Sequence, residues 1–210
     1  MCQHWLMKKS GYHHGDLRSA LVDTGLQLLG KGGPAALVAR EATRVSGVSV
    51  TALYRHFESV EQWRAEVSRA AREELARTII ATMEADSGRG TRAAVSRRRF
   101  RACGEGYIQF ALDHPQLFAG AFTAHGASPS QPDDPSPYAV LEQSLDDLVD
   151  SGLLQPKLRR DAPTIAWTAV HGLAALIAQG AMDAKTVKDH RIQVVLDAVA
   201  KSLGVWSSQK

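Results

Sequence analysis

The side chains in this chain that could do chemistry are better suited to binding than to catalysis. His13 and His14 are adjacent and follow His4, but neighbouring residues on a helix point about 100° apart, and no cluster of cysteines or carboxylates accompanies them. The sequence also has no evident nucleophile–base pair, no glycine loop suited to phosphate and no HExxH spacing. We therefore expect neither an enzyme nor a cofactor or metal site.

Segment 36–57 carries the strongest binding signal. It contains two short helical stretches that meet at a turn, where Gly47 can take a positive φ and Ser49 can cap the second stretch. Leu53 and Phe57, four residues apart, anchor the second stretch on one side and turn its other side outward. This spacing is typical of a helix-turn-helix, whose second helix enters the major groove of DNA.

The excess charge of the chain lies in the same region. The 210 residues have a formal net charge of +3. Residues 1–60 hold seven Lys and Arg against four Asp and Glu, whereas residues 61–210 are balanced, with 18 of each. Such an asymmetry favours an anionic partner at one end of the molecule, and by itself it fits nucleic acid or a membrane surface.

Helical periodicity predicts the elements that must position these residues. Apolar residues recur at spacings of three, four and seven, and no strand-like alternation or internal repeat appears, so the predicted fold class is all-α with about nine helices. Asp161 is expected at the N-cap of one of them. A loop is expected at 126–137, which is rich in Pro, Ser and Asp. The predicted helices are 14–29, 37–45, 49–55, 58–85, 92–113, 116–124, 138–154, 162–182 and 186–203.

Composition excludes several classes of protein. At 44% hydrophobic and 22% charged residues, the chain can bury a core and is not disordered. Cys2 and Cys103 form neither a disulfide framework nor a metal knuckle, which favours a reducing, cytoplasmic location. The uncharged stretch 162–182 is long enough to span a bilayer, but it contains Pro163 and His171 and is rich in Ala and Gly. We expect a buried or dimer-facing helix there, and no membrane anchor.

Five stretches of the N-terminal part carry a family resemblance, namely YHHGDLRSAL at 12–21, LLGKGGP at 28–34, ARE at 39–41, SGVSVTALYRHF at 46–57 and SVEQW at 59–63. Through them, residues 12–67 resemble the DNA-binding domain of the TetR family of transcriptional regulators. In the C-terminal part, two further stretches resemble signatures of one TetR subgroup, namely HPQLF at 114–118 and WTAVHG at 167–172. The chain departs from the family pattern at Val38, where a capping Ser or Thr is usual, and at Val60, where a Lys is usual.

The resemblance implies three parts and a DNA-binding face. The parts are a flexible arm at 1–11, a helix-turn-helix domain at 12–60 and a domain for ligand binding and dimerisation at 61–210. Small side chains of the second helix would face bases, whereas Tyr54 and His56 would contact phosphates. The implied DNA-binding residues are Arg40, Arg44, Ser49, Val50, Thr51, Ala52, Tyr54, Arg55 and His56.

Two more sets of residues are expected in the C-terminal domain. A ligand pocket between helices would be lined by Met83, Phe100, Tyr107, Phe110, Phe118, Phe122, Trp167 and His171. Core packing is the alternative for each of these side chains. The last two helices would form the four-helix interface of a homodimer, with close approach at Gly172, Ala174, Ala175, Ala178, Val195 and Val199.

The predicted function is a ligand-responsive transcriptional regulator. The resemblance favours a repressor that binds a palindromic operator on double-stranded DNA as a homodimer and is released by an unidentified small molecule, with the helix 58–85 as the lever. Two alternatives stay open. One is a helical small-molecule-binding or enzymatic domain without sequence-specific DNA binding, and the other is a membrane-associated protein anchored by 162–182.

Overall fold

The computed structural model describes residues 17–85, 88–123, 136–183 and 190–205, and all regular secondary structure in these ranges is helical. The all-α fold class predicted from the sequence is thereby confirmed. The expected arm at 1–11 and all but the last two residues of the expected loop at 126–137 lie outside the described residues. The described helices are α1 (Leu17–Gly32), the 3-10 helix η1 (Pro34–Ala36), α2 (Ala39–Ser46), α3 (Val50–His56), α4 (Val60–Glu84), α5 (Arg92–Asp113), α6 (Pro115–Ala121), α7 (Pro137–Asp150), the 3-10 helix η2 (Pro156–Leu158), α8 (Ala162–Ala178) and α10 (Ile192–Ser202).

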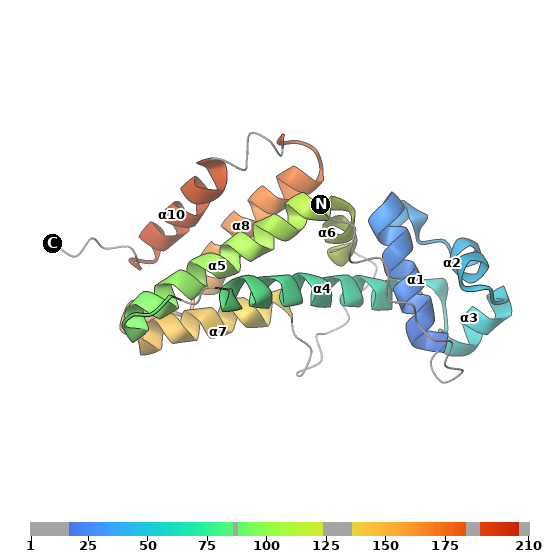
Figure 1. The fold of residues 1–210 in the computed structure, drawn as a ribbon, viewed down its shortest axis with the longest axis horizontal. Coiled ribbons are helices and arrows are strands. Elements are labelled where there is room, and N and C mark those ends of the chain that lie inside the picture. The colour runs from blue at the N-terminus through green and yellow to red at the C-terminus, as the bar shows by residue number, and fades with distance from the viewer. Residues whose placement is uncertain (1–16, 86–87, 124–135, 184–189, 206–210) are drawn as a thin grey trace.

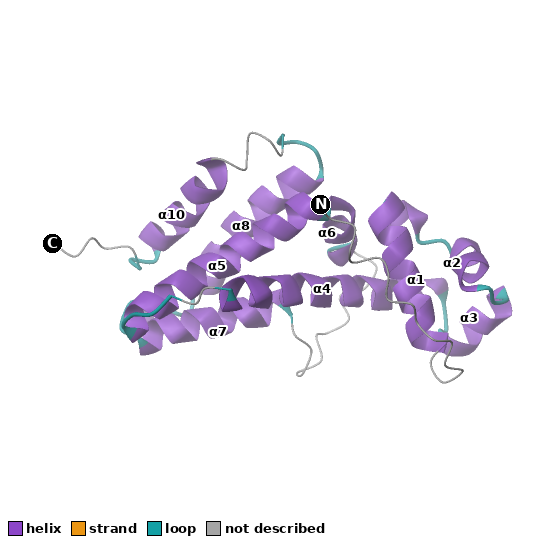
Figure 2. Cartoon of the chain, in the orientation of Figure 1, coloured by secondary structure: helices purple, strands orange, loops and turns teal. Residues whose placement is uncertain are grey.

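The helices form an elongated molecule with two unlike ends (Figure 1). Helices α1, α2 and α3 make one end, and the long α4 runs from them into the middle of the other (Figure 2). There α5 packs against α4, α7 and α8, while α10 covers an outer side of α5 and α8. The short α6 contacts α1, α4, α5 and α8, so it lies where the two ends of the molecule meet.

Three helices end just before a glycine with a left-handed backbone conformation, and each ends at a different residue from the one that periodicity predicted. α1 continues to Gly32 and ends at Gly33, whose φ is 68°. α7 ends at Asp150 instead of 154, and α8 at Ala178 instead of 182, because Gly152 and Gly180 each take a φ above 70° shortly after the last helical turn. For α7 and α8 the predicted ends were too late because apolar residues after these glycines, Leu154 and Met182 among them, still pack on the core.

Serine and threonine side chains cap several helix starts. The Ser59 hydroxyl accepts from the backbone N–H of Gln62 at 3.0 Å, and Thr91 and Ser136 cap α5 and α7 in the same way. Asp161 occupies the N-cap position of α8, as predicted, but its side chain makes no capping hydrogen bond. Its backbone is in the αR region instead of the extended region that a capping side chain requires.

The hydrophobic core runs without a break from α1 into the helices of the other end. Trp63, in the first turn of α4, is fully buried and donates its indole N–H to the carbonyl of Leu21 at 3.0 Å. One residue later, the Arg64 guanidinium donates to the carbonyl of Leu37 at 2.8 Å. The start of α4 is therefore packed as part of the α1–α3 unit, while its later turns pack against α5.

None of the helices in the described part of the chain combines the length and the apolarity that a membrane crossing needs. The uncharged stretch that raised this question forms α8, whose Val170, Leu173, Ala174 and Ile177 are buried against the rest of the fold.

Candidate DNA-binding face and ligand cavity

The turn between α2 and α3 has the geometry that the sequence predicted. Gly47 has φ 69° and ψ 26°, and the N–H of Val48 donates to the carbonyl of Thr43 at 3.0 Å, closing the end of α2. The Ser49 hydroxyl then accepts from the N–H of Ala52 at 3.2 Å and caps α3. Val38 occupies the N-cap of α2 and makes no side-chain hydrogen bond, so α2 lacks a side-chain cap, as the sequence predicted.

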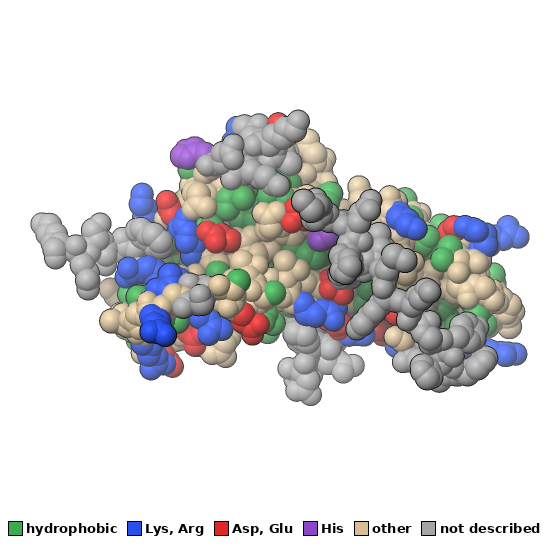
Figure 3. All heavy atoms as spheres, viewed as in Figure 1, with side chains coloured by type: hydrophobic (Ala, Val, Ile, Leu, Met, Phe, Trp, Pro, Cys, Tyr) green, Lys and Arg blue, Asp and Glu red, His purple; other side chains and the backbone are tan. Residues whose placement is uncertain are grey.

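The buried side of α3 fixes which side chains face outward. Leu53 and Phe57 are almost fully buried, and α3 packs against α1 and α2. All the residues implied as DNA contacts in α2 and α3 are exposed except Ala52, which is half-buried. The end of the molecule made by α1–α3 also displays Lys and Arg side chains in the space-filling view (Figure 3).

Two apolar side chains are prominent on this exposed face. Tyr54 is 50% exposed and Val50 is 40% exposed, although side chains of these types are more often buried. Around them lie the basic side chains of Arg55 and His56 in the last turn of α3, a helix without any acidic residue. The face therefore presents apolar and cationic groups together, a combination that suits thymine methyl groups and phosphates.

Arg44 is held by an ion pair within its own helix. Its guanidinium donates to both carboxylate oxygens of Glu41, at 2.8 and 2.6 Å. This hydrogen bond holds the pKa of Glu41 below its ordinary value and raises that of Arg44. Both groups are at the surface, so the pair stabilises the fold little, but it places a carboxylate beside the cations of the candidate DNA-binding face.

Contacts that the sequence gave no reason to expect hold α2 and α3 against their neighbours. The Thr24 and Ser46 hydroxyls lie 2.9 Å apart at the crossing of α1 and α2. Arg18 lies over the Phe57 ring, 4.9 Å from its centroid, and reaches Glu66 of α4 at 3.2 Å. Residue type alone could not reveal these pairs, because each joins positions far apart in the chain.

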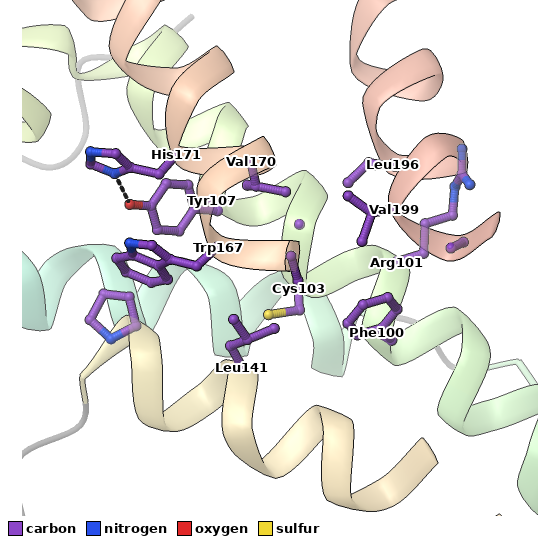
Figure 4. Close-up of a pocket in the computed structure, with 14 residues that line it drawn as sticks. Phe100, Arg101, Cys103, Tyr107, Leu141, Trp167, Val170, His171, Leu196 and Val199 are labelled. Atoms are coloured by element: carbon purple, nitrogen blue, oxygen red, sulfur yellow. Dashed lines mark hydrogen bonds between the residues drawn. The ribbon is translucent and has the colours of Figure 1, made fainter. Parts of the chain in front are cut away.

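A second candidate site is a cavity of about 40 Å³ between α5, α7, α8 and α10 (Figure 4). Four of the expected pocket residues line it, namely Phe100, Tyr107, Trp167 and His171. Most of the remaining lining was not predicted from the sequence; it consists of Arg101, Cys103, Gly104, Pro137, Leu141, Ala166, Val170, Leu196, Val199 and Ala200.

The other four expected pocket residues do not line this cavity. Met83, Phe110 and Phe118 are buried in the main core, and Phe122 is partly buried against it. The reason is the phase of the helices, since α5 turns Phe110 towards the core and Phe100 towards the cavity. For these four side chains, core packing describes the structure better than the pocket lining that was expected.

A cluster of aromatic rings closes one end of the cavity. The Tyr107 hydroxyl lies 2.7 Å from His171 Nδ1, and the His171 ring stacks on Trp167 at a centroid distance of 5.8 Å and an angle of 7°. Phe118 and Phe122 complete the cluster. Burial lowers the pKa of His171 and raises that of Tyr107, so both side chains are neutral near pH 7.

The residues expected at a dimer interface divide between the two sides of α8 and α10. Gly172, Ala175, Ala178 and Val195 are partly buried, and a Cβ added at Gly172 would meet nothing within 4 Å. Ala174 and Val199 point inward instead and are buried, Val199 as a wall of the cavity.

Apolar side chains that sequence reasoning missed lie on the outer side of the same helices. They are Ile165 and Leu176 on α8 and Val194 on α10, and the last two are 44% and 48% exposed. The exposure of Ile165 and Leu176 could not be predicted from the sequence. α8 is apolar almost all the way round, so periodicity does not separate its buried face from its exposed face.

The expected absence of a metal site concerned residues that the structure mostly does not describe. His4, His13 and His14 lie outside the described ranges. Among residues within those ranges, no group of three or more His, Cys, Asp or Glu side chains could hold a metal ion.

Comparison with known proteins identifies both the C-terminal part and the fold. Residues 100–199 match the family of tetracyclin repressor-like C-terminal domains. No curated protein matches the chain. A putative TetR-family regulator from Vibrio parahaemolyticus is 17% identical, with a TM-score of 0.62 over 90% of this chain and 98% of that one.

Two further solved structures have the same fold. A TetR-family regulator from Marinobacter aquaeolei VT8 is 18% identical, with a TM-score of 0.61 over 89% of this chain and 94% of that one. RolR in complex with resorcinol is 17% identical, with a TM-score of 0.60 over 90% of this chain and 88% of that one. The family match and the shared architecture agree with the motifs at 12–67: residues 100–199 belong to the family of tetracyclin repressor-like C-terminal domains, and the chain as a whole has the fold of these TetR-family regulators.

Proposed function

We propose that this protein is a non-enzymatic, cytoplasmic transcriptional regulator that binds a palindromic DNA operator as a homodimer and responds to a small-molecule effector. We favour repression as its mode of action, with the effector releasing the DNA. The single observation that carries the proposal is the exposed face of α3, which is anchored by Leu53 and Phe57 and presents Thr51 and Tyr54 outward.

The chemistry of α3 supports DNA as the partner. Ser49, Val50, Thr51 and Ala52 are small enough to let the helix approach base edges closely, and the Thr and Val methyl groups suit thymine. Tyr54 can donate a hydrogen bond to a phosphate oxygen from the next turn. Since phosphate contacts fix the register and base contacts read the sequence, we assign Tyr54 to positioning and Thr51 to readout.

The outer faces of α8 and α10 support a homodimer. Leu176 and Val194 are apolar and exposed, and beside them Gly172 leaves open space where a second helix could approach closely. A single helix-turn-helix contacts only one half-site, so a two-fold dimer is needed to read a palindrome. Helix α4, packed against α1 at one end and α5 at the other, would connect ligand binding with the spacing of the two α3 helices.

The cavity beside Tyr107 and Trp167 supports a small-molecule effector. Apolar cavities between helices are common ligand sites in bundles, and this one is bordered by a cluster of aromatic rings. RolR, which shares the fold, has been solved with resorcinol bound. An effector can shift the DNA-binding equilibrium only by binding one dimer geometry more tightly than the other.

Gel-shift titration against the DNA that flanks the gene of this protein tests the proposal. We expect a palindromic segment to bind more tightly than random DNA at ~150 mM salt, where non-specific binding is weak. Tyr54→Phe should weaken binding to all sequences alike, whereas Thr51→Ala should change the preference among operator variants. Equal affinity for the palindrome and random DNA would contradict the proposal, and would leave a helical ligand-binding protein as the better description.

A further inference from the structure

Most of the cavity wall is apolar. Leu141 of α7 and Val170 of α8 face Leu196 and Val199 of α10 across it, and Phe100 of α5 closes one end (Figure 4). A polar ligand would lose its hydrogen bonds to water on entering such a space without gaining replacements, at a cost of several kcal/mol for a charged group.

The ionisable groups of the lining provide no free charge. Arg101 is paired with Glu105 at 3.2 Å and with Asp197 of α10 at 2.7 Å. Burial raises the pKa of the Cys103 thiol to about 12, so it stays protonated. The Tyr107 hydroxyl is hydrogen-bonded to Nδ1 of His171, the other ionisable group of the lining, and burial lowers the pKa of this imidazole and keeps it neutral near pH 7 (Figure 4). An anion and a cation would both be unfavourable occupants.

The size of the cavity shows that a ligand must move one wall. Its volume is about 40 Å³, whereas an engineered apolar cavity that binds benzene measures about 150 Å³. The existing space is therefore too small for even a single ring, although it is lined by the rings of Phe100, Tyr107 and Trp167.

Helix α10 is the wall that can move at the lowest cost. α5, α7 and α8 pack on one another through fully buried residues such as Leu145, Leu148 and Ala174. Within one chain α10 packs mainly on α8 and α5, and its Leu196 side chain fills the space beside Gly104, where an added Cβ would lie 2.4 Å from Leu196 Cδ2. Swinging this side chain out would join that space to the cavity.

We propose that the cavity binds an uncharged, mainly apolar molecule about the size of one aromatic ring, and that Leu196 and α10 move to admit it. The inference deepens the proposed function and rests on it only in treating this molecule as the effector. Because α10 also carries Val194 on the proposed dimer face, an occupied cavity would shift the helix through which the two chains meet.

Three probes of the same ring size but different charge test the chemistry of the site. We would titrate toluene, benzoate and benzylammonium into the full chain by isothermal calorimetry, without DNA. Saturable binding of toluene is expected, with no heat of binding from the two ions at the same concentrations. Binding of either ion as tightly as toluene, or binding of no probe at all, would overturn the inference.

Two substitutions of Leu196 test the moving wall in opposite directions. Leu196→Ala should tighten toluene binding about three- to tenfold, because the cavity no longer has to open first, and Leu196→Phe should weaken it about tenfold or more by filling the space. Gln193→Ala, an exposed position on α10, is the control and should leave the affinity unchanged. Tighter toluene binding by Leu196→Ala cannot result from misfolding of the variant, so this substitution remains informative even if Leu196→Phe fails to fold. Equal toluene affinity in both Leu196 variants would contradict the moving wall.

The result is separable from the proposed function. If an operator is bound specifically but toluene is not bound, the inference about the cavity fails and the regulator proposal stands. If toluene binds with the expected pattern but no operator is recognised, the cavity assignment stands and the regulator proposal fails.

Discussion

Single side chains at the aromatic cluster show how burial sets their protonation. His171 is half-buried, with the Phe122 ring centroid 4.8 Å away and Trp167 stacked on its face. Removing water disfavours the charged imidazole, and this burial alone accounts for its lowered pKa. The neutral ring can accept a hydrogen bond from the Tyr107 hydroxyl through Nδ1, which a protonated ring cannot do.

The lowered pKa of His171 predicts a loss of stability in mild acid. In the unfolded chain the imidazole takes up a proton near its ordinary value of 6.5, and in the folded chain only at a lower pH. Its contribution is therefore complete above pH 6.5 and is lost as the pH falls through the folded value. Urea unfolding at pH 7.5 and pH 5 should show a larger loss for the natural chain than for His171→Gln. Equal losses would exclude this imidazole as a source of acid sensitivity.

The Glu41–Arg44 ion pair leads to a prediction about DNA affinity. Glu41→Gln removes a negative charge from the candidate DNA-binding face and frees the Arg44 guanidinium, so it should strengthen binding to any DNA about two- to fivefold at low salt. The gain should shrink as salt increases. Glu74→Gln is a matched control, because Glu74 pairs with Arg77 at the same spacing, 2.7 Å apart, on α4. If both variants gain equally, overall net charge and not the position of Glu41 explains the effect.

At the level of helices, the sequence predicted starts better than ends. Ser49 caps α3 and Gly47 forms the preceding turn as expected, because both signals are local and depend on one residue type each. The ends of α7 and α8 were placed four residues too late, since the apolar pattern continues past Gly152 and Gly180. Periodicity reports which residues are buried, and residues just beyond a helix can be buried too.

The cavity was predicted less completely than the helix-turn-helix. Aromatic types correctly indicated burial for Phe110 and Phe118, but no sequence pattern shows which buried ring borders a void and which packs in the core. Leu196 and Gly104 were missed for the same reason, because their juxtaposition depends on how α10 lies across α5. Tertiary packing decides such sites, whereas the candidate DNA-binding face follows from one continuous segment.

The two N-caps of the helix-turn-helix allow a paired stability prediction. Ser49→Ala should lower the free energy of unfolding by about 1 kcal/mol, and Val38→Ser should raise it by about 0.5–1 kcal/mol. Val38 already has the extended backbone of an N-cap residue, with φ −111° and ψ 125°, and its side chain is exposed, so the new hydroxyl displaces no core contact. Urea unfolding without DNA measures both changes. Destabilisation by Val38→Ser would mean that its methyl groups contribute more than the cap.

Across the whole molecule, α6 and α4 are the elements that contact both ends. Gly120 of α6 faces Leu29 of α1 so closely that an added Cβ would lie 2.3 Å from a Leu29 methyl carbon. An added Cβ at Gly33 would likewise overlap the Gln116 side chain of α6. The contact at Gly120 leaves little room for α6 to move independently of α1, so the cavity end and the candidate DNA-binding end are mechanically connected through a packed core.

If two chains meet through the outer faces of α8 and α10, substitutions on these faces should prevent dimerisation and, with it, operator binding. Leu176→Asp places a charge on the outer face of α8, where it is harmless to a single chain but would be desolvated between two. Gly172→Leu adds a side chain that has open space in one chain and would clash with a closely packed partner helix. We expect sedimentation to show a dimer for the natural chain and a monomer for both variants.

Val45→Asp provides the matched control for this experiment, since Val45 is 45% exposed at the opposite end of the molecule and should leave the dimer intact. Leu176→Asp should also lose operator binding while its α3 remains folded, because each chain then contacts one half-site alone and the joint binding energy of two half-sites is lost. Its weak, salt-sensitive binding to random DNA should persist. If instead Leu176→Asp stays dimeric, the two chains meet elsewhere, and the spacing of the recognition helices cannot be set by α8 and α10.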